Sequence, residues 1–370
     1  MRTDTTRKLP PFFTQVIGSL PRPRVVIDLH TRRSELSEDR FQGILDEMVV
    51  FAIRLQEQAG LDVVSDGEWR RIHYVDEFLQ RIGGFEKIRP FGHAGEKKFH
   101  LVATGAMQSR EPVFARDAEF LVRHTDRVKK FALPSPFLLG IRYWHEEFSG
   151  KAYPTVQHFM AHVTRILANE AKALEQAGID IIQLDDPALT YFCDRKLMSA
   201  GETHDDRLRQ SWDADKQVEE AVGYINAIVE GLRAEVHLHC CHSVYKRKSD
   251  VSGNYEPLIP RLRNAQVDRL NLEFAYQGTG EIADLRLLPE GLRVGMGVVD
   301  VRNERLQSVE EIESLGAAGA GLVAPERIAL NPDCGFAPGM GEPPSIDEAF
   351  EKLARLVQAA QRLRRRFPAR

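Results

Sequence analysis

The chain has 370 residues, of which 43% are hydrophobic and 28% charged, and its formal net charge is −4. This composition is typical of a globular enzyme, and the weak negative charge excludes a general attraction to nucleic acid or to anionic membranes. No apolar run approaches a membrane span, and the first residues lack the apolar core of a signal peptide. Four cysteines are too few for a disulfide framework, so we expect a cytoplasmic protein. Its expected partners are small molecules, and the sequence leaves open whether it forms a homo-oligomer.

Short apolar segments alternate with longer amphipathic segments along the chain. Several of the short ones are nearly continuous apolar runs, as is typical of strands covered on both faces. The predicted strands are Thr14–Ser19, Leu61–Ser65, Phe131–Pro134, Ile179–Leu184, Val236–Cys241, Arg269–Phe274, Leu292–Val298 and Arg327–Asn331. The predicted helices are Glu35–Gln58, Val156–Ala177, Ala214–Arg233, Ser308–Ala318 and Ser345–Arg366, the last opening with a Ser345–Glu348 capping box.

Eight strand–helix repeats of this kind predict an α/β fold, a (β/α)8 TIM barrel that spans residues 1–370 as a single domain. A doubly wound open sheet is the alternative. The segment 85–130 interrupts the repeat, because it is polar and contains Gly92-His93-Ala94-Gly95. We expect it to form an insertion after the second βα unit, either a hairpin or a lid.

An apolar–polar alternation over residues 235–243 ends in a cluster of histidines and cysteines. Because successive side chains of a strand point to opposite faces, His239 and Cys241 share one face and Cys240 takes the other. An imidazole and a thiolate two positions apart suit zinc, which usually takes four ligands. From these residues alone, a metal site and a buried strand with inert cysteines are equally good interpretations.

Polar residues follow most of the predicted strands, at the point where each strand ends. In a barrel these ends open onto one rim, where such enzymes carry their catalytic residues. Each group alone fits a loop acid or a turn, and their joint placement is what indicates a functional site. In chain order they are Ile17-Gly18-Ser19, Asp66-Gly67-Glu68, Asp185-Asp186-Pro187, His239 with Cys241, Glu273, Asp300 with Arg302, and Asn331-Pro332-Asp333-Cys334-Gly335.

This ordered set of motifs resembles the catalytic barrel of the cobalamin-independent methionine synthase family. Its most specific part is the pairing of His239-Cys240-Cys241 with the distant Asn331-Pro332-Asp333-Cys334-Gly335, and Gln183-Leu184-Asp185-Asp186-Pro187-Ala188 adds to it. The likeness spans most of the chain. It is greatest to the short family members that contain a single barrel.

The resemblance implies an S-methyltransferase that transfers a methyl group to the thiol of homocysteine or of a similar small molecule. It implies zinc as the cofactor, and the residues that match the family's zinc ligands are His239, Cys241, Glu273 and Cys334. It also implies that Glu68 and Asp185 hold the amino group of homocysteine. Groups around Ile17 and Ser19 would then orient its other end. Two carboxylates on one rim suit an ammonium group, which favours an amino-acid thiol over a sulfonate such as coenzyme M.

One position departs from the family pattern. Methionine synthases carry a histidine after the seventh strand that protonates the departing folate nitrogen, and this chain has Asp300-Val301-Arg302 there. Arginine stays charged at physiological pH, so we expect Arg302 in the catalytic site as an anion-binding group and a poor general acid. The donor is therefore open between folate, a methylcobalamin protein, a simple methylated metabolite and an epoxide. His73 and His242 are the first other acids to test.

Two further functions are alternatives. One is an alkyl transferase or lyase that resembles epoxyalkane:coenzyme M transferase, which Arg302 favours as a sulfonate partner and the two rim carboxylates disfavour. The other is a non-catalytic barrel that zinc stabilises or that binds thiols. The acids on the rim make this last function the weakest of the three.

Overall fold

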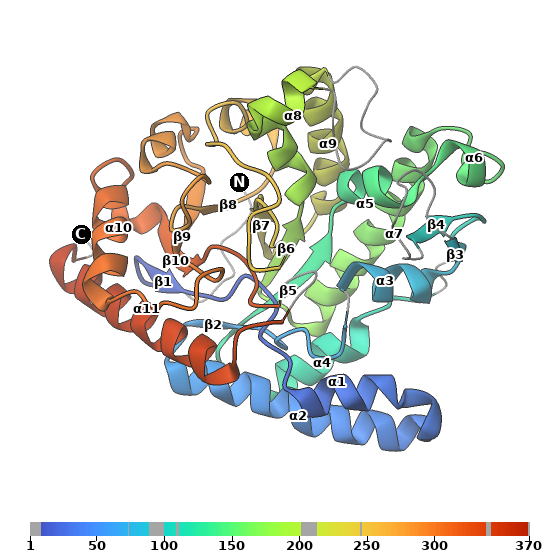
Figure 1. The fold of residues 1–370 in the computed structure, drawn as a ribbon, viewed down its shortest axis with the longest axis horizontal. Helices are drawn as coiled ribbons and strands as arrows, with labels where there is room; N and C mark the ends of the chain where they lie inside the picture. The colour runs from blue at the N-terminus through green and yellow to red at the C-terminus, as the bar shows by residue number, and fades with distance from the viewer. Residues whose placement is uncertain are drawn as a thin grey trace.

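The computed structural model describes residues 9–72, 74–88, 100–108, 111–200, 213–244, 246–337 and 342–368. Its parallel strands are β1 (Phe13–Thr14), β2 (Val63–Val64), β5 (Val128–Pro134), β6 (Ile181–Asp185), β7 (Glu235–His239), β8 (Arg269–Glu273), β9 (Arg293–Val299) and β10 (Ile328–Pro332). They form one eight-stranded sheet in the order β1-β10-β9-β8-β7-β6-β5-β2. A bridge between Gln15 and Val63 links its end strands, so the sheet curls into a nearly closed barrel (Figure 1). The predicted (β/α)8 barrel is confirmed, which rules out the open sheet.

Long helices cover the outside of the barrel, and all five predicted helices are present. They are α2 (Glu38–Ala59), α7 (Val156–Ala177), α9 (Ala214–Val229), α10 (Val309–Ala320) and α11 (Ile346–Arg366). Gly60 and Gly178 end α2 and α7 in the left-handed conformation that glycine adopts without strain, at φ of 89° and 102°. Ser345 accepts a hydrogen bond from the Glu348 amide at the start of α11. The Glu348 carboxylate binds Arg247 and Lys352, so only half of the predicted capping box forms.

Shorter helices fill the connections between these elements. The α-helices are α1 (Arg24–Thr31), α3 (Tyr74–Ile82), α4 (Ala115–His124), α5 (Pro136–Tyr143), α6 (Glu146–Ser149) and α8 (Arg195–Ala200). The 3-10 helices are Arg33–Glu35, Pro187–Cys193, Ile259–Asn264, Ile282–Leu287 and Pro325–Arg327. The Pro187–Cys193 helix follows β6 after Asp186, and its Pro187 lies at the rim cavity.

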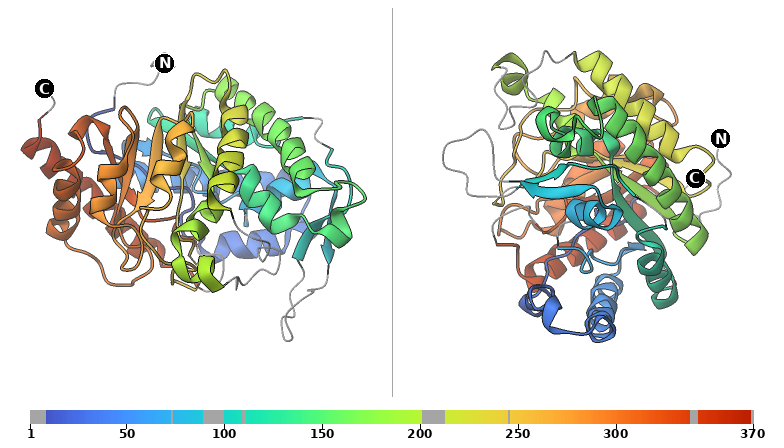
Figure 2. Two further views of the ribbon diagram at one scale, coloured as in Figure 1. Left: turned by 90° about the horizontal axis from the view of Figure 1, so that it is seen from above. Right: turned by 90° about the vertical axis from the view of Figure 1, so that its right-hand side faces the viewer.

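A two-stranded antiparallel ribbon lies outside the barrel. It pairs β3 (Phe85–Ile88) with β4 (His100–Ala103), and it lies at the end of the molecule opposite α10 and α11 (Figure 2). The 85–130 segment also contains α4 and the start of β5, so the ribbon occupies only its first part. Residues 89–99, which include Gly92-His93-Ala94-Gly95, residues 109–110 and His73 lie outside the described residues. A lid function stays a prediction.

The barrel interior is polar, and its side chains form hydrogen bonds with one another. The Lys130 ammonium donates to the side-chain oxygens of Gln15 at 3.2 Å and Gln183 at 3.0 Å. The Asn271 amide donates to the same Gln183 oxygen at 2.9 Å and accepts from Gln15 at 3.1 Å. Burial lowers the pKa of Lys130 to about 7, although Asp185 and Glu68 oppose this effect. The closed set of hydrogen bonds satisfies groups that would otherwise be costly to bury.

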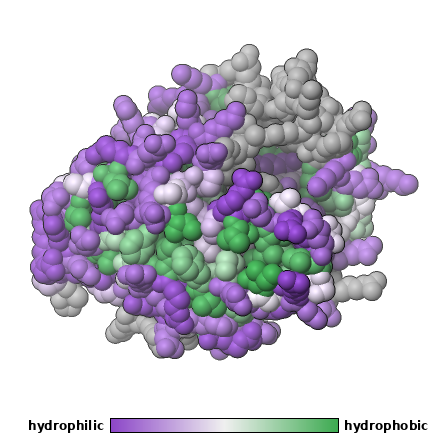
Figure 3. All heavy atoms as spheres, turned by 60° about the horizontal axis from the view of Figure 1, so that its bottom comes forward, coloured by the Kyte–Doolittle hydropathy of each residue, from purple (hydrophilic) through white to green (hydrophobic). Residues whose placement is uncertain are grey.

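The surface combines apolar and charged areas. Figure 3 shows an apolar band on one face, with hydrophilic side chains around it. Single large apolar side chains are also exposed, among them Val25 of α1 and Phe51 of α2. Within the described residues, no helix is long and apolar enough to cross a membrane.

The polar interior predicts a sharp intolerance of added volume at Gly295 in β9. A Cβ atom there would lie 2.0 Å from the Asn271 side-chain oxygen and 2.5 Å from that of Asn331. Gly295→Ala should therefore lower the free energy of unfolding by about 1–3 kcal/mol in a urea titration. The control is Gly43→Ala in α2, where an added Cβ atom would meet no group within 4 Å outside the adjoining helix backbone, and alanine should stabilise the helix. Equal stability of the two variants would contradict the packing described here.

Candidate active site

A cavity of about 360 Å³ opens among the carboxyl ends of the strands. This is the rim on which the sequence placed the functional residues. All of the predicted site residues except Glu273 and Arg302 line it. They are Ile17, Ser19, Glu68, Asp185, His239, Cys241 and Cys334. Residues as far apart in the chain as Ile17 and Cys334 thus share one wall, because the parallel strands end side by side.

His239 is the last residue of β7 and is oriented by Asp185, the last residue of β6. The His239 Nδ1 atom lies 3.0 Å from Asp185 Oδ1. Its Nε2 atom is buried and has no hydrogen-bond partner among the described residues. Ligand atoms of His239, Cys241 and Cys334 all lie within 4.8 Å of one another. An imidazole fixed through one nitrogen and free at the other, beside two thiols, fits a soft metal such as zinc.

The two thiols have different protonation behaviour. The hydrogen bond with Cys241, and after it the effect of His239, lower the pKa of Cys334 to about 6, although burial acts in the opposite direction. The same bond, together with burial, raises the pKa of Cys241. The site therefore offers one thiolate near neutral pH before any cation binds. Cys240 is wholly buried in the apolar core, on the side that the strand alternation predicted.

Asp185 is held in place by hydrogen bonds from the polar interior of the barrel. The Gln183 side-chain amide donates to Asp185 Oδ1 at 2.7 Å and to the Ile17 carbonyl oxygen at 3.0 Å. Its oxygen in turn accepts from Lys130. One carboxylate oxygen of Asp185 is thus shared by Gln183 and His239, so the polar interior fixes the orientation of the candidate metal ligand.

Glu68 supplies the second carboxylate on the cavity wall. Its backbone has a φ of 58°, and its amide donates to Asp66 Oδ1 at 3.0 Å. Its side chain packs against Gly18, where a Cβ atom would lie 2.3 Å from Glu68 Oε1. Burial raises the pKa of Glu68 to about 7, since the favourable charge of Arg71 is partly offset by Asp185. Gly18 therefore leaves the space that this carboxylate needs.

Glu273 and Arg302 lie behind the cavity wall and bind each other. Glu273 Oε1 accepts from Arg302 Nη2 at 2.8 Å, and both side chains are buried. The sequence placed Arg302 among the catalytic groups and Glu273 among the metal ligands. The structure brings neither into the cavity lining, and Glu273 is not in the cluster of His239, Cys241 and Cys334. Their roles stay predictions.

Several site residues were missed by the sequence reasoning. Tyr143 and Asp76 line the cavity and are joined by a hydrogen bond of 2.8 Å. Arg22 lines it too and donates to the Glu68 carbonyl oxygen at 3.1 Å. None of these residues stands in a motif that marks it. Gln183 lies two residues before Asp185 on the same predicted strand. Residues at this spacing point to the same face, so the sequence could have indicated that the two side chains meet.

Comparison with known proteins agrees with this geometry. The family model described as "Cobalamin-independent synthase, Catalytic domain" matches residues 12–93 and 154–362. A methionine synthase from Pyrococcus horikoshii is 29% identical, over 97% of this chain and 94% of that protein. One from Saccharolobus islandicus is 28% identical, over 96% of each. A B12-independent methionine synthase structure from Shewanella sp. W3-18-1 covers 97% of this chain and 99% of its own, with a TM-score of 0.76 and 23% identity.

The fold and the rim cavity thus define a (β/α)8-barrel enzyme with a cluster of two cysteines and a histidine that could bind a metal. The matched residues cover well over half of the chain. The chain belongs to the cobalamin-independent methionine synthase family, and it is an S-methyltransferase of the methionine synthase type.

The raised pKa of Glu68 predicts how its replacement changes stability with pH. The folded state holds the Glu68 proton more tightly than the unfolded state, so this stabilisation is complete below pH 4.5 and is lost as the pH rises through about 7. Glu68→Gln should therefore gain stability relative to the wild type between pH 4.5 and 8, by on the order of 3 kcal/mol. Urea titrations of both proteins at several pH values measure this difference. Parallel pH curves would contradict the assignment.

Proposed function

We propose that this enzyme transfers a methyl group to the thiol of homocysteine, with zinc bound by His239, Cys241 and Cys334. The observation that carries the proposal is that one cavity contains both this cluster and the carboxylates of Glu68 and Asp185. A substrate that bridges them must have a thiol at one end and a cationic group at the other. The structure of the Shewanella protein is a complex with selenomethionine, the selenium analogue of methionine.

The substrate's amino-acid end would bind on the part of the cavity wall that carries Glu68 and Asp185. The ammonium group would lie between Asp185 and the ionised form of Glu68, which predominates above a pH of about 7. Ile17 and Ser19 line the same wall and would orient the carboxylate through their backbone and hydroxyl groups. This arrangement would direct the thiol toward Cys241 and Cys334.

Zinc, when bound, would lower the pKa of the substrate thiol and so supply the thiolate that attacks the methyl carbon. The protein holds the ligands in place for this chemistry. Asp185 fixes the His239 ring through Nδ1, which leaves Nε2 as the donor atom. The family resemblance implies Glu273 as a fourth ligand, and in this structure its carboxylate is bound by Arg302 and His242. The proton for a folate leaving group would come from a residue other than Arg302, because Arg302 does not line the cavity.

The coenzyme M alternative loses its main support in this arrangement. It needed Arg302 as a partner for the sulfonate, and the Arg302 guanidinium is bonded to Glu273 and to the Ser243 carbonyl oxygen. Two carboxylates on the wall would also repel a sulfonate. An amino-acid thiol is therefore the better substrate.

Zinc binding should depend on the two cysteines of the cavity and not on the third. We expect about one zinc per purified chain, and Cys334→Ser or Cys241→Ser should reduce this content at least tenfold. Cys240→Ser is the matched control, because Cys240 lies in the apolar core and should leave the zinc content unchanged. Elemental analysis after dialysis measures all four proteins. Full zinc occupancy in both cavity variants would refute the assignment.

Acceptor specificity tests the function itself. The enzyme should methylate homocysteine at least tenfold faster than coenzyme M when methylcobalamin and methyltetrahydrofolate are each offered as the donor. Asp185→Asn should raise the KM for homocysteine tenfold or more, because it weakens the ammonium site and the orientation of His239 together. Mass spectrometry of the products measures both rates. Coenzyme M methylated as fast as homocysteine would contradict the proposal.

A further inference from the structure

The loop after β2 brings Glu68 to the cavity through an uncommon backbone conformation. Gly67 and Glu68 both have left-handed φ angles, of 65° and 58°. Glycine adopts this conformation without strain, whereas a residue with a Cβ atom rarely does. Such strain persists only where the surrounding structure enforces it. The contacts of this loop therefore decide where the Glu68 carboxylate lies.

Asp66 and Arg71 join the two sides of the turn that contains Glu68. Arg71 Nη2 donates to Asp66 Oδ1 at 3.1 Å and to Oδ2 at 3.3 Å, and both side chains are buried. Asp66 Oδ1 also accepts from the Glu68 amide at 3.0 Å. The same carboxylate oxygen thus binds the arginine and the turn, so Arg71 fixes the acceptor that holds the Glu68 backbone.

Arg71 is itself fixed by groups from neighbouring elements. Its Nη1 atom donates to the Ala132 carbonyl oxygen of β5 at 3.2 Å. Its guanidinium carbon lies 5.0 Å from the ring centroid of Phe114 and 4.6 Å from that of Phe131, which are favourable distances for a cation–π contact. These contacts connect the turn to the barrel wall.

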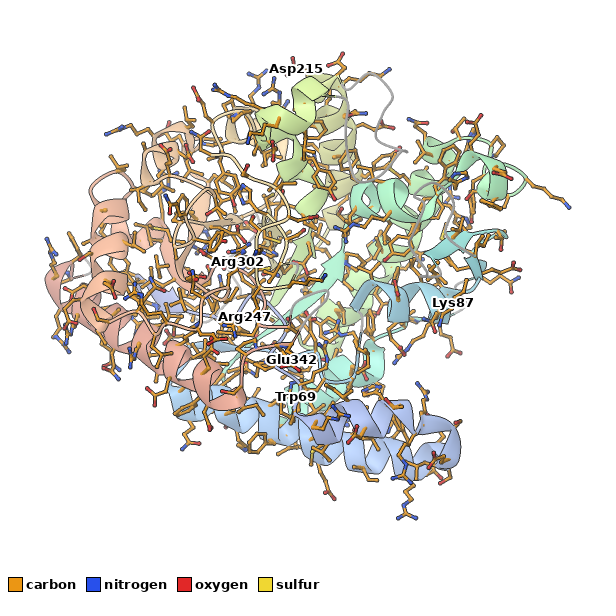
Figure 4. The ribbon with its side chains drawn as sticks, viewed as in Figure 1. Trp69, Lys87, Asp215, Arg247, Arg302 and Glu342 are labelled. Carbon is orange, nitrogen blue, oxygen red and sulfur yellow. The ribbon has the colours of Figure 1, made fainter. Side chains whose placement is uncertain are left out.

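The rest of the loop is anchored as well. Arg22 donates to the carbonyl oxygens of both Glu68 and Arg71, which ties the two ends of the turn together. Trp69 is fully buried, and its ring stacks on Phe51 of α2 with a centroid distance of 6.0 Å. Figure 4 labels Trp69 beside α2. The side chains of Glu68 and Trp69 are thus directed to different surroundings, the cavity and the helix layer.

The charges around the Glu68 carboxylate act in opposite directions. Those that face it are Arg71, Asp185, Arg22, Asp66 and Lys130. Burial raises the pKa of Glu68 to about 7, and Arg71 is the largest of the charges that oppose this effect. Asp66 acts in the same direction as burial. The two members of the ion pair therefore have opposite effects on the charge of Glu68.

We propose that Asp66 and Arg71 are positioning residues for the thiol acceptor, because their ion pair holds the turn that carries the Glu68 carboxylate into the cavity. This inference rests on the proposed function, in which Glu68 binds the ammonium group of homocysteine. Neither Asp66 nor Arg71 lines the cavity, so both act on the substrate only through Glu68.

Loss of either partner should change the acceptor site in a characteristic way. Without Arg71, Asp66 is left as a buried charge with no cation, and Glu68 faces other acids. Glu68 then keeps its proton to higher pH and attracts an ammonium group less. A neutral side chain at Asp66 has the opposite effect, because Arg71 then acts on Glu68 without that opposing charge.

The dependence of kcat/KM on pH tests this proposal in the zinc-loaded, full-length enzyme. The acid limb for homocysteine should have its midpoint near a pH of about 7, and Glu68→Gln should lack it. Arg71→Met should raise this midpoint by at least about one pH unit, which is about a tenfold loss of kcat/KM at pH 6. Asp66→Asn, whose amide oxygen can still accept from the Glu68 amide, should lower the midpoint by at least about half a unit.

A second thiol and two variants serve as controls. The thiol is 4-mercaptobutanoate, which lacks the amino group of homocysteine, and Arg71→Met should change its kcat/KM less than about threefold. Arg71→Lys keeps the charge and should restore the midpoint to within about half a unit. Arg70→Met removes the adjacent buried arginine, whose carboxylate partners are Asp46 and Asp117, and should leave the midpoint unchanged.

Unshifted midpoints in Arg71→Met and Asp66→Asn would overturn the inference, and so would equal losses with the two thiols. The proposed function would survive either result. If Arg71→Met does not fold, the direction of the shift in Asp66→Asn still decides the question. A wild type that does not prefer homocysteine to 4-mercaptobutanoate at any pH would overturn the ammonium site of the proposed function, and the inference with it.

Discussion

The hydrogen bond between Asp185 and His239 connects every part of the site. It fixes the imidazole through Nδ1, so that Nε2 is the atom presented to Cys241 and Cys334. The same carboxylate oxygen accepts from Gln183, whose own oxygen accepts from Lys130 in the barrel interior. Asp185 also lines the cavity, where it would bind the substrate's ammonium group. In the proposed function, the orientation of the metal ligand and the recognition of the substrate would both depend on this one side chain, which the barrel interior holds in place.

The barrel explains why these residues meet. Parallel strands place their carboxyl ends on one rim, so residues that end β6, β7 and β10 become neighbours although they are far apart in the chain. The loops then separate two environments. The cavity side holds the histidine–cysteine cluster and two carboxylates, and the side behind the wall holds the buried pair of Glu273 and Arg302. Two groups of residues with similar signals in the sequence therefore lie in different surroundings.

Much of this architecture could be predicted from the sequence. All eight predicted strands overlap observed strands, although Thr14–Ser19 shares only Thr14 with β1, because barrel strands buried on both faces are largely apolar in sequence. Lys130 was missed for the same reason, since the predicted strand began at Phe131 and excluded the lysine that faces the interior. The cavity residues followed from motifs at strand ends. The direction of the Arg302 side chain could not be predicted, because it depends on contacts with Glu273 at the end of β8 and with Ser243 in the loop after β7.

X-ray absorption at the zinc edge tests the central claim most directly, namely that His239, Cys241 and Cys334 form a metal centre that receives the substrate thiol. The zinc-loaded enzyme should show two sulfur neighbours, from Cys241 and Cys334, together with nitrogen from His239. Saturating homocysteine should add a third sulfur, whereas homoserine, which has a hydroxyl in place of the thiol, should not. A sulfur count that stays at two with saturating homocysteine would contradict the account.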